Sequence, residues 1–323
     1  MNHLCLLGCT FTSAQYIGPM AVDDATSALL AQLAEAGRPP IHQLPVQEAR
    51  GDFAVLAGLV APGPALHAVR EDTVRADDGY KIPVRVYSAT EQPRGAIVYF
   101  HGGGWVLGSV AQYDAVARRL AAVTNCVVVS ADYRLAPEFR YPTAARDAWD
   151  VTNWTSSSWP TLPLIVSGDS AGGNLAAVVG QRAARESGPP IALQILIYPV
   201  TDHDVDTVSY LDPANQLLLQ RDSMIWFWNH YAPDPATRSH PDASPLRGGL
   251  EGSPPALVLI PEYDVLRHEG EAYADALARA GIPVQINIFD GQMHGFFQLP
   301  GVLPAADAAL ELIAERIAAV TGG

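Results

Sequence analysis

Several common sequence features are scarce or missing in this chain, and each absence narrows the range of functions. Only 3 of its 323 residues are cysteine, too few for a disulfide framework at this length, so a reducing compartment, the cytoplasm, is expected. Acidic residues outnumber basic ones by 34 to 20, and the net charge of −14 argues against nucleic acid or anionic membranes as partners. No run of about 18 apolar residues occurs, so no segment is expected to span a membrane.

Lysine is almost absent as well. Lys81 is the single lysine, and this bias toward arginine, with abundant alanine, indicates a GC-rich bacterial source. The segment Leu6-Leu7-Gly8-Cys9 resembles a lipoprotein cleavage site, but no basic residue precedes it. Its apolar stretch is also shorter than the roughly 7–15 residues that a signal peptide requires. Residues 1–19 are therefore predicted to be an N-terminal extension, with Met20 as the natural first residue.

From residue 96 onward the chain alternates between strand-like and helix-like segments. Short apolar runs predict strands at 68–75, 82–88, 96–100, 126–130, 163–167, 193–199, 256–260 and 284–289. Helical spacing of apolar residues is found over 24–36, 110–124, 142–158, 171–186, 268–280 and 303–320. This alternation predicts an α/β fold with a mostly parallel sheet, helices on both faces and an antiparallel hairpin at one edge. The Pro- and Gly-rich stretch that ends at Pro64 is assigned neither helix nor strand.

A candidate nucleophile lies where one predicted strand gives way to a helix. The pentapeptide Gly168-Asp169-Ser170-Ala171-Gly172 directly follows the strand at 163–167. A serine on such a sharp turn presents its hydroxyl group, and small neighbours leave room for a base and a substrate. Ser170 is therefore the predicted nucleophile, whereas Asp169 is expected to serve the turn. A serine nucleophile of this type needs a carboxylate and then a histidine later in the chain.

His294 is the predicted base. It follows the last predicted strand, within the small-residue loop Gly291-Gln292-Met293-His294-Gly295. His203 and His268 are expected at solvated surface positions, and His101 is expected to anchor its own loop.

Asp264 is the preferred orienting acid, because the strand before it neighbours the strand that leads to His294. Asp202 and Asp290 also follow predicted strands and stay open as alternatives. Each of these carboxylates could equally be a capping or turn residue. Glu262 is expected to point away from the site as a structural partner.

A run of glycines supplies candidate donors for an oxyanion hole. His101-Gly102-Gly103-Gly104-Trp105 follows the strand at 96–100, and glycine lets backbone N–H groups turn toward a ligand. Gly102 and Gly103, together with Ala171 after the nucleophile, are the expected donors. The run could instead bind phosphate, but the chain contains neither of the usual glycine-rich nucleotide-binding patterns.

One segment is dense in metal-ligating residue types, Asp202-His203-Asp204-Val205-Asp206. Neither an H-E-x-x-H motif nor a cysteine pair accompanies it, so it is interpreted as a solvated loop. No metal is expected.

These motifs together resemble those of the bacterial hormone-sensitive-lipase-like carboxylesterases, which have the α/β-hydrolase fold. The resemblance extends from about residue 20 to the C-terminus and rests on the segments His101–Trp105, Asp132–Glu138, Gly168–Gly172, Tyr263–Gly270 and His294–Phe296. The family's acid segment usually reads Asp-Pro-Leu-Arg-Asp-Glu-Gly. Val265 and His268 therefore depart from the pattern, and neither alters the carboxylate itself.

The resemblance implies a serine carboxylesterase that hydrolyses short-chain acyl esters, without a cofactor, on an eight-stranded sheet with a small helical cap. The cap would comprise residues 20–50 and an insertion at 205–240, leaving 51–204 and 241–323 as the catalytic domain. Asp132–Glu138 would be scaffold, and a homodimer is a common state in the family. Candidate substrate-binding residues are Trp105, Leu219 and Trp226.

Two other classes of function stay open at this point. A receptor-like homologue could keep the fold and bind a ligand without turnover, as the related plant gibberellin receptors do after losing the catalytic histidine. An amidase, a lactonase or a deacetylase would use the same triad and differ only in the pocket.

Overall fold

A computed structural model describes residues 22–322, so the predicted extension at 1–19 lies outside the described residues. Eight strands form one sheet in the order β1-β2-β4-β3-β5-β6-β7-β8. The strands are β1 (Ala68–Arg75), β2 (Lys81–Ser88), β3 (Ala96–Phe100), β4 (Val127–Ala131), β5 (Leu164–Asp169), β6 (Ile191–Ile197), β7 (Ala256–Tyr263) and β8 (Val284–Met293). Strand β2 runs antiparallel to β1 and β4, and all other neighbours are parallel. The predicted mostly parallel sheet with an edge hairpin is confirmed.

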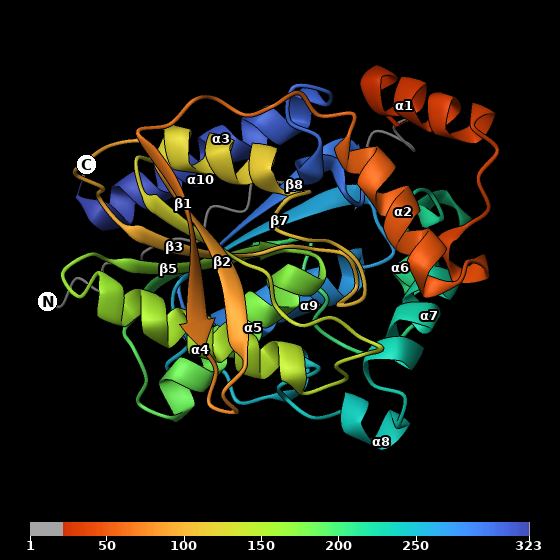
Figure 1. Cartoon of the computed structure of the whole chain (residues 1–323). Coiled ribbons are helices and arrows are strands. Elements are labelled where there is room, and N and C mark those ends of the chain that lie inside the picture. Colours follow the sequence, from red (N-terminus) through yellow and green to blue (C-terminus); the bar gives the residue numbers. More distant parts are fainter. Residues whose placement is uncertain (1–21, 323) are drawn as a thin grey trace, which may run out of the picture.

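Helices cover both faces of this sheet (Figure 1). Helices α3 (Asp114–Thr124) and α10 (Pro304–Thr321) lie on one face, and α4 (Thr143–Ser158), α5 (Ala171–Arg185) and α9 (Arg267–Arg279) lie on the other. Alternate residues of β3 enter opposite cores: Val98 and Phe100 pack on the side of α4 and α5, whereas Ile97 and Tyr99 pack on the side of α3 and α10. Burial on both faces explains why the strands are continuous apolar runs.

The remaining helices gather at one end of the molecule, at the right of Figure 1. They are α1 (Asp24–Glu35), α2 (Val46–Ala57), α6 (Val208–Leu211), α7 (Arg221–Tyr231) and α8 (Pro235–Arg238). Four short 3₁₀ helices complete the described secondary structure: η1 (Ile41–Gln43), η2 (Pro213–Asn215), η3 (Pro245–Arg247) and η4 (Phe296–Gln298). The two predicted cap pieces touch each other, since His42 Nδ1 lies 3.4 Å from Ser223 Oγ.

Helix α2 corrects the sequence analysis, which assigned neither helix nor strand between the predicted helix at 24–36 and Pro64. Pro45 precedes the first turn, where a proline is tolerated because its missing N–H would have no helical partner. Ala49 on this helix is fully buried, so tertiary packing supports a segment whose composition alone does not predict a helix. The helix spans Val46–Ala57 and therefore crosses the boundary expected at residue 50.

The sequence analysis expected no membrane-spanning segment and no disulfide framework. Among the helices of residues 22–322, none is both long and apolar enough to cross a membrane. Cys126 is a free, buried thiol, and burial raises its pKa to about 11. Cys5 and Cys9 lie outside the described residues.

The parallel strands bring remote segments of the chain to one edge of the sheet. The loops that follow β3, β5, β7 and β8 carry His101, Ser170, Asp264 and His294 in turn. Because the carboxyl ends of parallel strands meet at the same edge, this is where an α/β fold usually builds its site.

Candidate active site

Ser170 occupies the strained turn between β5 and α5. Its backbone has φ 56° and ψ −119°, outside the regions that a serine ordinarily adopts. The turn is possible because its neighbours lack side chains: a Cβ on Gly172 would overlap the Phe100 carbonyl oxygen, and one on Gly168 would overlap Gly172. The Ser170 side chain is buried but for a small exposed part.

Ser170, His294 and Asp264 are joined by a continuous chain of hydrogen bonds. The Ser170 Oγ is 3.0 Å from His294 Nε2, and His294 Nδ1 is 2.7 Å from Asp264 Oδ2. The second oxygen of Asp264 accepts the N–H of Leu266 at 2.9 Å, which fixes the fully buried carboxylate. An ionised carboxylate can only accept, so Nδ1 carries the proton and Nε2 is free to accept the serine hydroxyl. The structure thus brings together all three residues of the expected triad.

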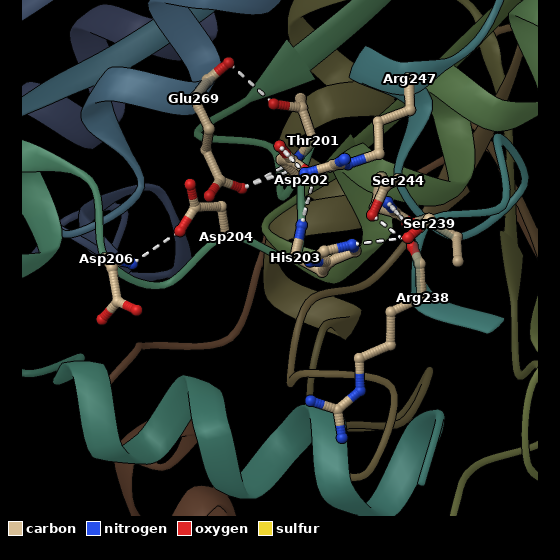
Figure 2. A network of polar contacts seen from close by, with 12 residues as sticks. Thr201, Asp202, His203, Asp204, Asp206, Arg238, Ser239, Ser244, Arg247 and Glu269 are labelled. Atoms are coloured by element: carbon tan, nitrogen blue, oxygen red, sulfur yellow. Dashed lines mark hydrogen bonds and ion pairs between the residues drawn. The ribbon is translucent and has the colours of Figure 1, made fainter. Parts of the chain in front are cut away.

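The alternative acids, Asp202 and Asp290, lie in different surroundings. Asp202 pairs with Arg247, with Nε and Oδ1 2.6 Å apart, in a polar network that also contains Glu269 (Figure 2). Asp290 is exposed to solvent. Glu262 accepts the N–H of Gly291 at 2.8 Å, which supports the segment that leads to His294.

The three other histidines weighed in the sequence analysis lie outside this set of hydrogen bonds. His101 is fully buried, its Nδ1 lies 2.7 Å from the Gly102 carbonyl oxygen, and burial lowers its pKa. His203 contacts Ser239, with Nε2 and Oγ 2.9 Å apart (Figure 2), and His268 is exposed. Within residues 22–322, no group of three or more His, Cys, Asp or Glu side chains is arranged to hold a metal ion.

The glycine loop differs from the expectation at one position. The N–H of Gly102 donates to Asp169 Oδ1 at 2.9 Å, so it is not available to an oxyanion. Within residues 22–322, the N–H groups of Gly103 and Gly104 donate to no other group. Both residues have positive φ, 112° and 59°, which glycine adopts without strain. The N–H of Ala171 begins helix α5 and has no helical acceptor.

The expected substrate contacts are only partly compatible with the structure. Trp105 is fully buried and stacks on Tyr231 with ring centroids 4.2 Å apart, leaving no exposed surface for a substrate. Leu219 is buried in the hydrophobic core, and Trp226 is half-buried against Phe227 and His230.

Two neighbours of these residues contact the catalytic loops instead, and the sequence analysis missed both. A Cβ on Gly104 would overlap the Phe227 ring, so Phe227 lies directly on the glycine loop. Leu218 Cδ2 would lie 3.3 Å from a Cβ on Gly295, beside the catalytic histidine. The apolar pattern of 217–219 and 224–228 indicates such contacts, but adjacent positions cannot be told apart without the structure.

Arg50 is a further residue that the sequence analysis missed. From helix α2 its guanidinium donates to the carbonyl oxygens of Val106 at 2.9 Å and Ala136 at 3.0 Å. It also forms a two-pronged pair with Glu138, both distances being 2.8 Å. Arg50 therefore links helix α2 to the end of the glycine loop by hydrogen bonds.

Comparisons with known proteins show the family of this chain. A family model described as alpha/beta hydrolase fold matches residues 97–298. Ethyl acetate hydrolase of Pseudomonas putida is 36% identical over 304 residues, covering 88% of this chain and 95% of the relative. Carboxylesterase NlhH of Mycobacterium tuberculosis is 37% identical, covering 75% of this chain and 79% of the relative. The solved structure of a hyperthermophilic esterase from the archaeon Pyrobaculum calidifontis superimposes with a TM-score of 0.87 at 37% identity, covering 92% and 98% of the two chains.

Proposed function

This chain belongs to the alpha/beta hydrolase fold family and is an esterase, and from that premise we propose that Ser170, His294 and Asp264 are its catalytic triad. The observation that supports this proposal is the continuous chain of hydrogen bonds from Ser170 Oγ through the imidazole of His294 to Asp264. The HGGG run at His101–Gly104 and the GDSAG pentapeptide further suggest the hormone-sensitive-lipase-like branch of the family.

In the proposed reaction, Ser170 Oγ attacks the ester carbonyl carbon while its proton passes to His294 Nε2. Asp264 holds the imidazole in the right tautomer and stabilises its positive charge. The negative oxygen of the tetrahedral intermediate accepts hydrogen bonds from the N–H groups of Gly103, Gly104 and Ala171, because these groups have no other acceptor within residues 22–322. His294 then protonates the departing alcohol, leaving an acyl-enzyme. Water, deprotonated by the same imidazole, hydrolyses that acyl-enzyme.

Ser170→Ala tests the proposed nucleophile. The variant is expected to fold, since alanine relieves no packing and removes one hydroxyl, and to hydrolyse p-nitrophenyl acetate at least about 10⁴-fold more slowly. Activity would be measured beside circular dichroism, so that loss of fold is separated from loss of chemistry. A folded variant with wild-type turnover would contradict the assignment.

We propose esters of short acyl chains as substrates. Phe227 and Leu218 place apolar side chains on the two catalytic loops, and the helices of the two predicted cap pieces gather at one end of the molecule (Figure 1). We expect apolar side chains at these two positions to favour small, uncharged acyl groups. Turnover of p-nitrophenyl esters from acetyl to palmitoyl is expected to be fastest at the short end. Fastest turnover of palmitate would overturn this substrate class.

A homodimer through strand β8 is proposed as the assembled state. Strand β8 is an edge of the sheet, and Ile286 and Ile288 on it are each 44% exposed. An edge strand with exposed apolar residues offers backbone groups for pairing with a second copy. Sedimentation is expected to give a dimer for the wild type and a monomer for Ile286→Lys/Ile288→Lys. A monomeric wild type would contradict the proposal.

The cytoplasm is the proposed compartment. The buried free thiol of Cys126 supports this assignment, because reducing compartments preserve such thiols. A bacterial source is supported by the arginine bias and by the bacterial relatives.

A further inference from the structure

We propose that Asp169, the neighbour of the nucleophile, is the positioning residue that sets the conformation of the oxyanion loop, residues 101–105. The proposal rests on the proposed function, because it assigns the donors of that loop to the reaction of Ser170. It replaces the expectation that Asp169 merely serves its own turn.

Asp169 is fully buried, and all the groups that bind its carboxylate come from other segments. Its Oδ1 accepts the hydroxyl of Tyr99 at 2.8 Å and the N–H of Gly102 at 2.9 Å. Its Oδ2 accepts the hydroxyl of Tyr113 at 2.9 Å and the side-chain amide of Gln298 at 3.1 Å. One carboxylate beside Ser170 therefore joins β3, the oxyanion loop, the start of α3 and the segment that follows the catalytic histidine.

Stability alone gives no reason for a carboxylate at this place. All four donors are electrically neutral, and burying a carboxylate without a cation is costly. Burial raises the pKa of Asp169, although its hydrogen bonds from Tyr99 and Tyr113 act in the opposite direction. An uncharged side chain of the same size would avoid this cost. What the carboxylate provides is an acceptor strong enough to hold several donors at once.

The oxyanion loop is pressed against this carboxylate. A Cβ on Gly102 would overlap Asp169 Oδ2 and lie 2.9 Å from the Tyr113 hydroxyl oxygen, so only glycine allows the approach. The N–H of Gly102 donates to Asp169 Oδ1 and also to the hydroxyl oxygen of Tyr113 at 3.1 Å, a hydroxyl that itself donates to Asp169. The chain then turns at Gly103 and Gly104, whose φ values are positive and whose N–H groups have no acceptor within residues 22–322. The carboxylate thus determines which amides of the loop donate to Asp169 and which are left for an oxyanion.

The same carboxylate also reaches the base. Gln298 lies in η4, four residues after His294, and its amide nitrogen bonds Asp169 Oδ2. Nucleophile, oxyanion donors and base are therefore fixed relative to one another through a single buried group. Small displacements among such groups are enough to slow the chemical step.

Asp169→Asn tests the proposal, because it keeps the size of the side chain but turns one acceptor into a donor. We expect kcat on p-nitrophenyl acetate to fall about 10- to 100-fold with KM within about twofold, since loss of a single oxyanion donor costs about 10²–10³. The rate of inactivation by a p-nitrophenyl phosphonate, whose adduct places an oxygen in the oxyanion hole, is expected to fall in parallel. The melting temperature is expected not to fall, because the variant removes a buried charge.

Asp147→Asn is the matched control. Asp147 is equally buried but is paired with Arg134 at 2.6 Å, in scaffold away from the triad. It is expected to lose thermal stability and to keep kcat within about twofold, the opposite of the result for Asp169→Asn. Asp169→Ser, whose hydroxyl is too short to hold Gly102, is measured in the same way if asparagine is not accommodated.

Wild-type kcat in a folded Asp169 variant would overturn the proposal, and so would a fall in kcat with wild-type inactivation by the phosphonate. A loss of activity that only follows loss of folded protein would also overturn it. Ser170→Ala in the same series separates this inference from the proposed function. If Ser170→Ala stays active, the nucleophile is misassigned; if it is inactive while Asp169→Asn is normal, only the positioning role fails.

Discussion

Three aspartates near the site have different roles because each meets different partners. Asp264 accepts from His294 and from a backbone N–H, so its charge is directed at the imidazole. Asp202 forms an ion pair with Arg247 (Figure 2). Among residues 22–322, the donors to Asp169 are all neutral, and its proposed role is to order the oxyanion loop. Similar side chains after neighbouring strands thus act on the base, on the scaffold and on the oxyanion loop.

Asp264→Asn and Asp202→Asn form a matched pair at the residue scale. Asparagine at 264 can present an N–H to His294 and favour the wrong tautomer, so kcat is expected to fall about 10⁴-fold. Asparagine at 202 removes a partly exposed ion pair, so kcat is expected to stay within a few-fold of wild type. Both would be measured on p-nitrophenyl acetate. A larger loss for Asp202→Asn would assign the acid to Asp202.

That the three residues of the proposed triad lie together could be predicted, because chain order and position after a strand constrain them strongly. Ser170, Asp264 and His294 each follow a parallel strand, and parallel strands end at one edge. Chain order and position after a strand do not determine where a single backbone N–H of the glycine loop points. Gly102 and Gly103 are equivalent in the sequence, and their roles differ because the N–H of Gly102 donates to Asp169 and to the Tyr113 hydroxyl.

At the scale of elements, hydrogen bonds join the N-terminal helical segment to the catalytic loops. Arg50 on α2 bonds the carbonyl oxygen of Val106, two residues beyond Gly104. Before α1, the N–H of Asp23 donates to the Gly291 carbonyl oxygen at 3.1 Å, three residues before His294. The strands were predictable because both faces of the sheet are buried. Helix α2 was not, because contacts with distant residues such as Val106 stabilise it and its own sequence gives little sign of them.

Arg50→Ala tests the contribution of these contacts. The change removes hydrogen bonds to two carbonyl oxygens and the Glu138 pair, and it is expected to lower the free energy of unfolding by about 1–3 kcal/mol. It is also expected to lower kcat/KM about tenfold, because the end of the glycine loop loses its support. Urea unfolding and ester hydrolysis would measure the two effects.

Arg38→Ala is the control for Arg50→Ala. Arg38 pairs with Asp52, which lies on α2 like Arg50, but its side chain is 46% exposed and forms no hydrogen bond with a catalytic loop among residues 22–322. Its loss is expected to change the free energy of unfolding by about 0.5 kcal/mol or less and to leave kcat/KM unchanged. Equal effects of the two variants would contradict a specific role for Arg50.

At the scale of the whole molecule, the site is assembled from segments that are far apart in the chain. Ser170 and His294 are separated by 124 positions, and the sheet order places their strands within one continuous layer. The class of fold and the sheet could therefore be predicted from alternation and apolar runs. The apolar contacts on the catalytic loops could not, because Phe227 and Leu218 belong to an insertion whose path the sequence pattern does not define.

Covalent labelling of the nucleophile tests the central claim most directly. The protein would be treated with a p-nitrophenyl phosphonate, digested and analysed by peptide mass spectrometry, with Ser170→Ala treated in parallel. The account predicts one phosphonyl group per chain, located on Ser170, with loss of esterase activity in proportion to labelling and no labelling of the variant. Labelling of another residue that abolishes activity, or full inactivation with Ser170 unmodified, would contradict it.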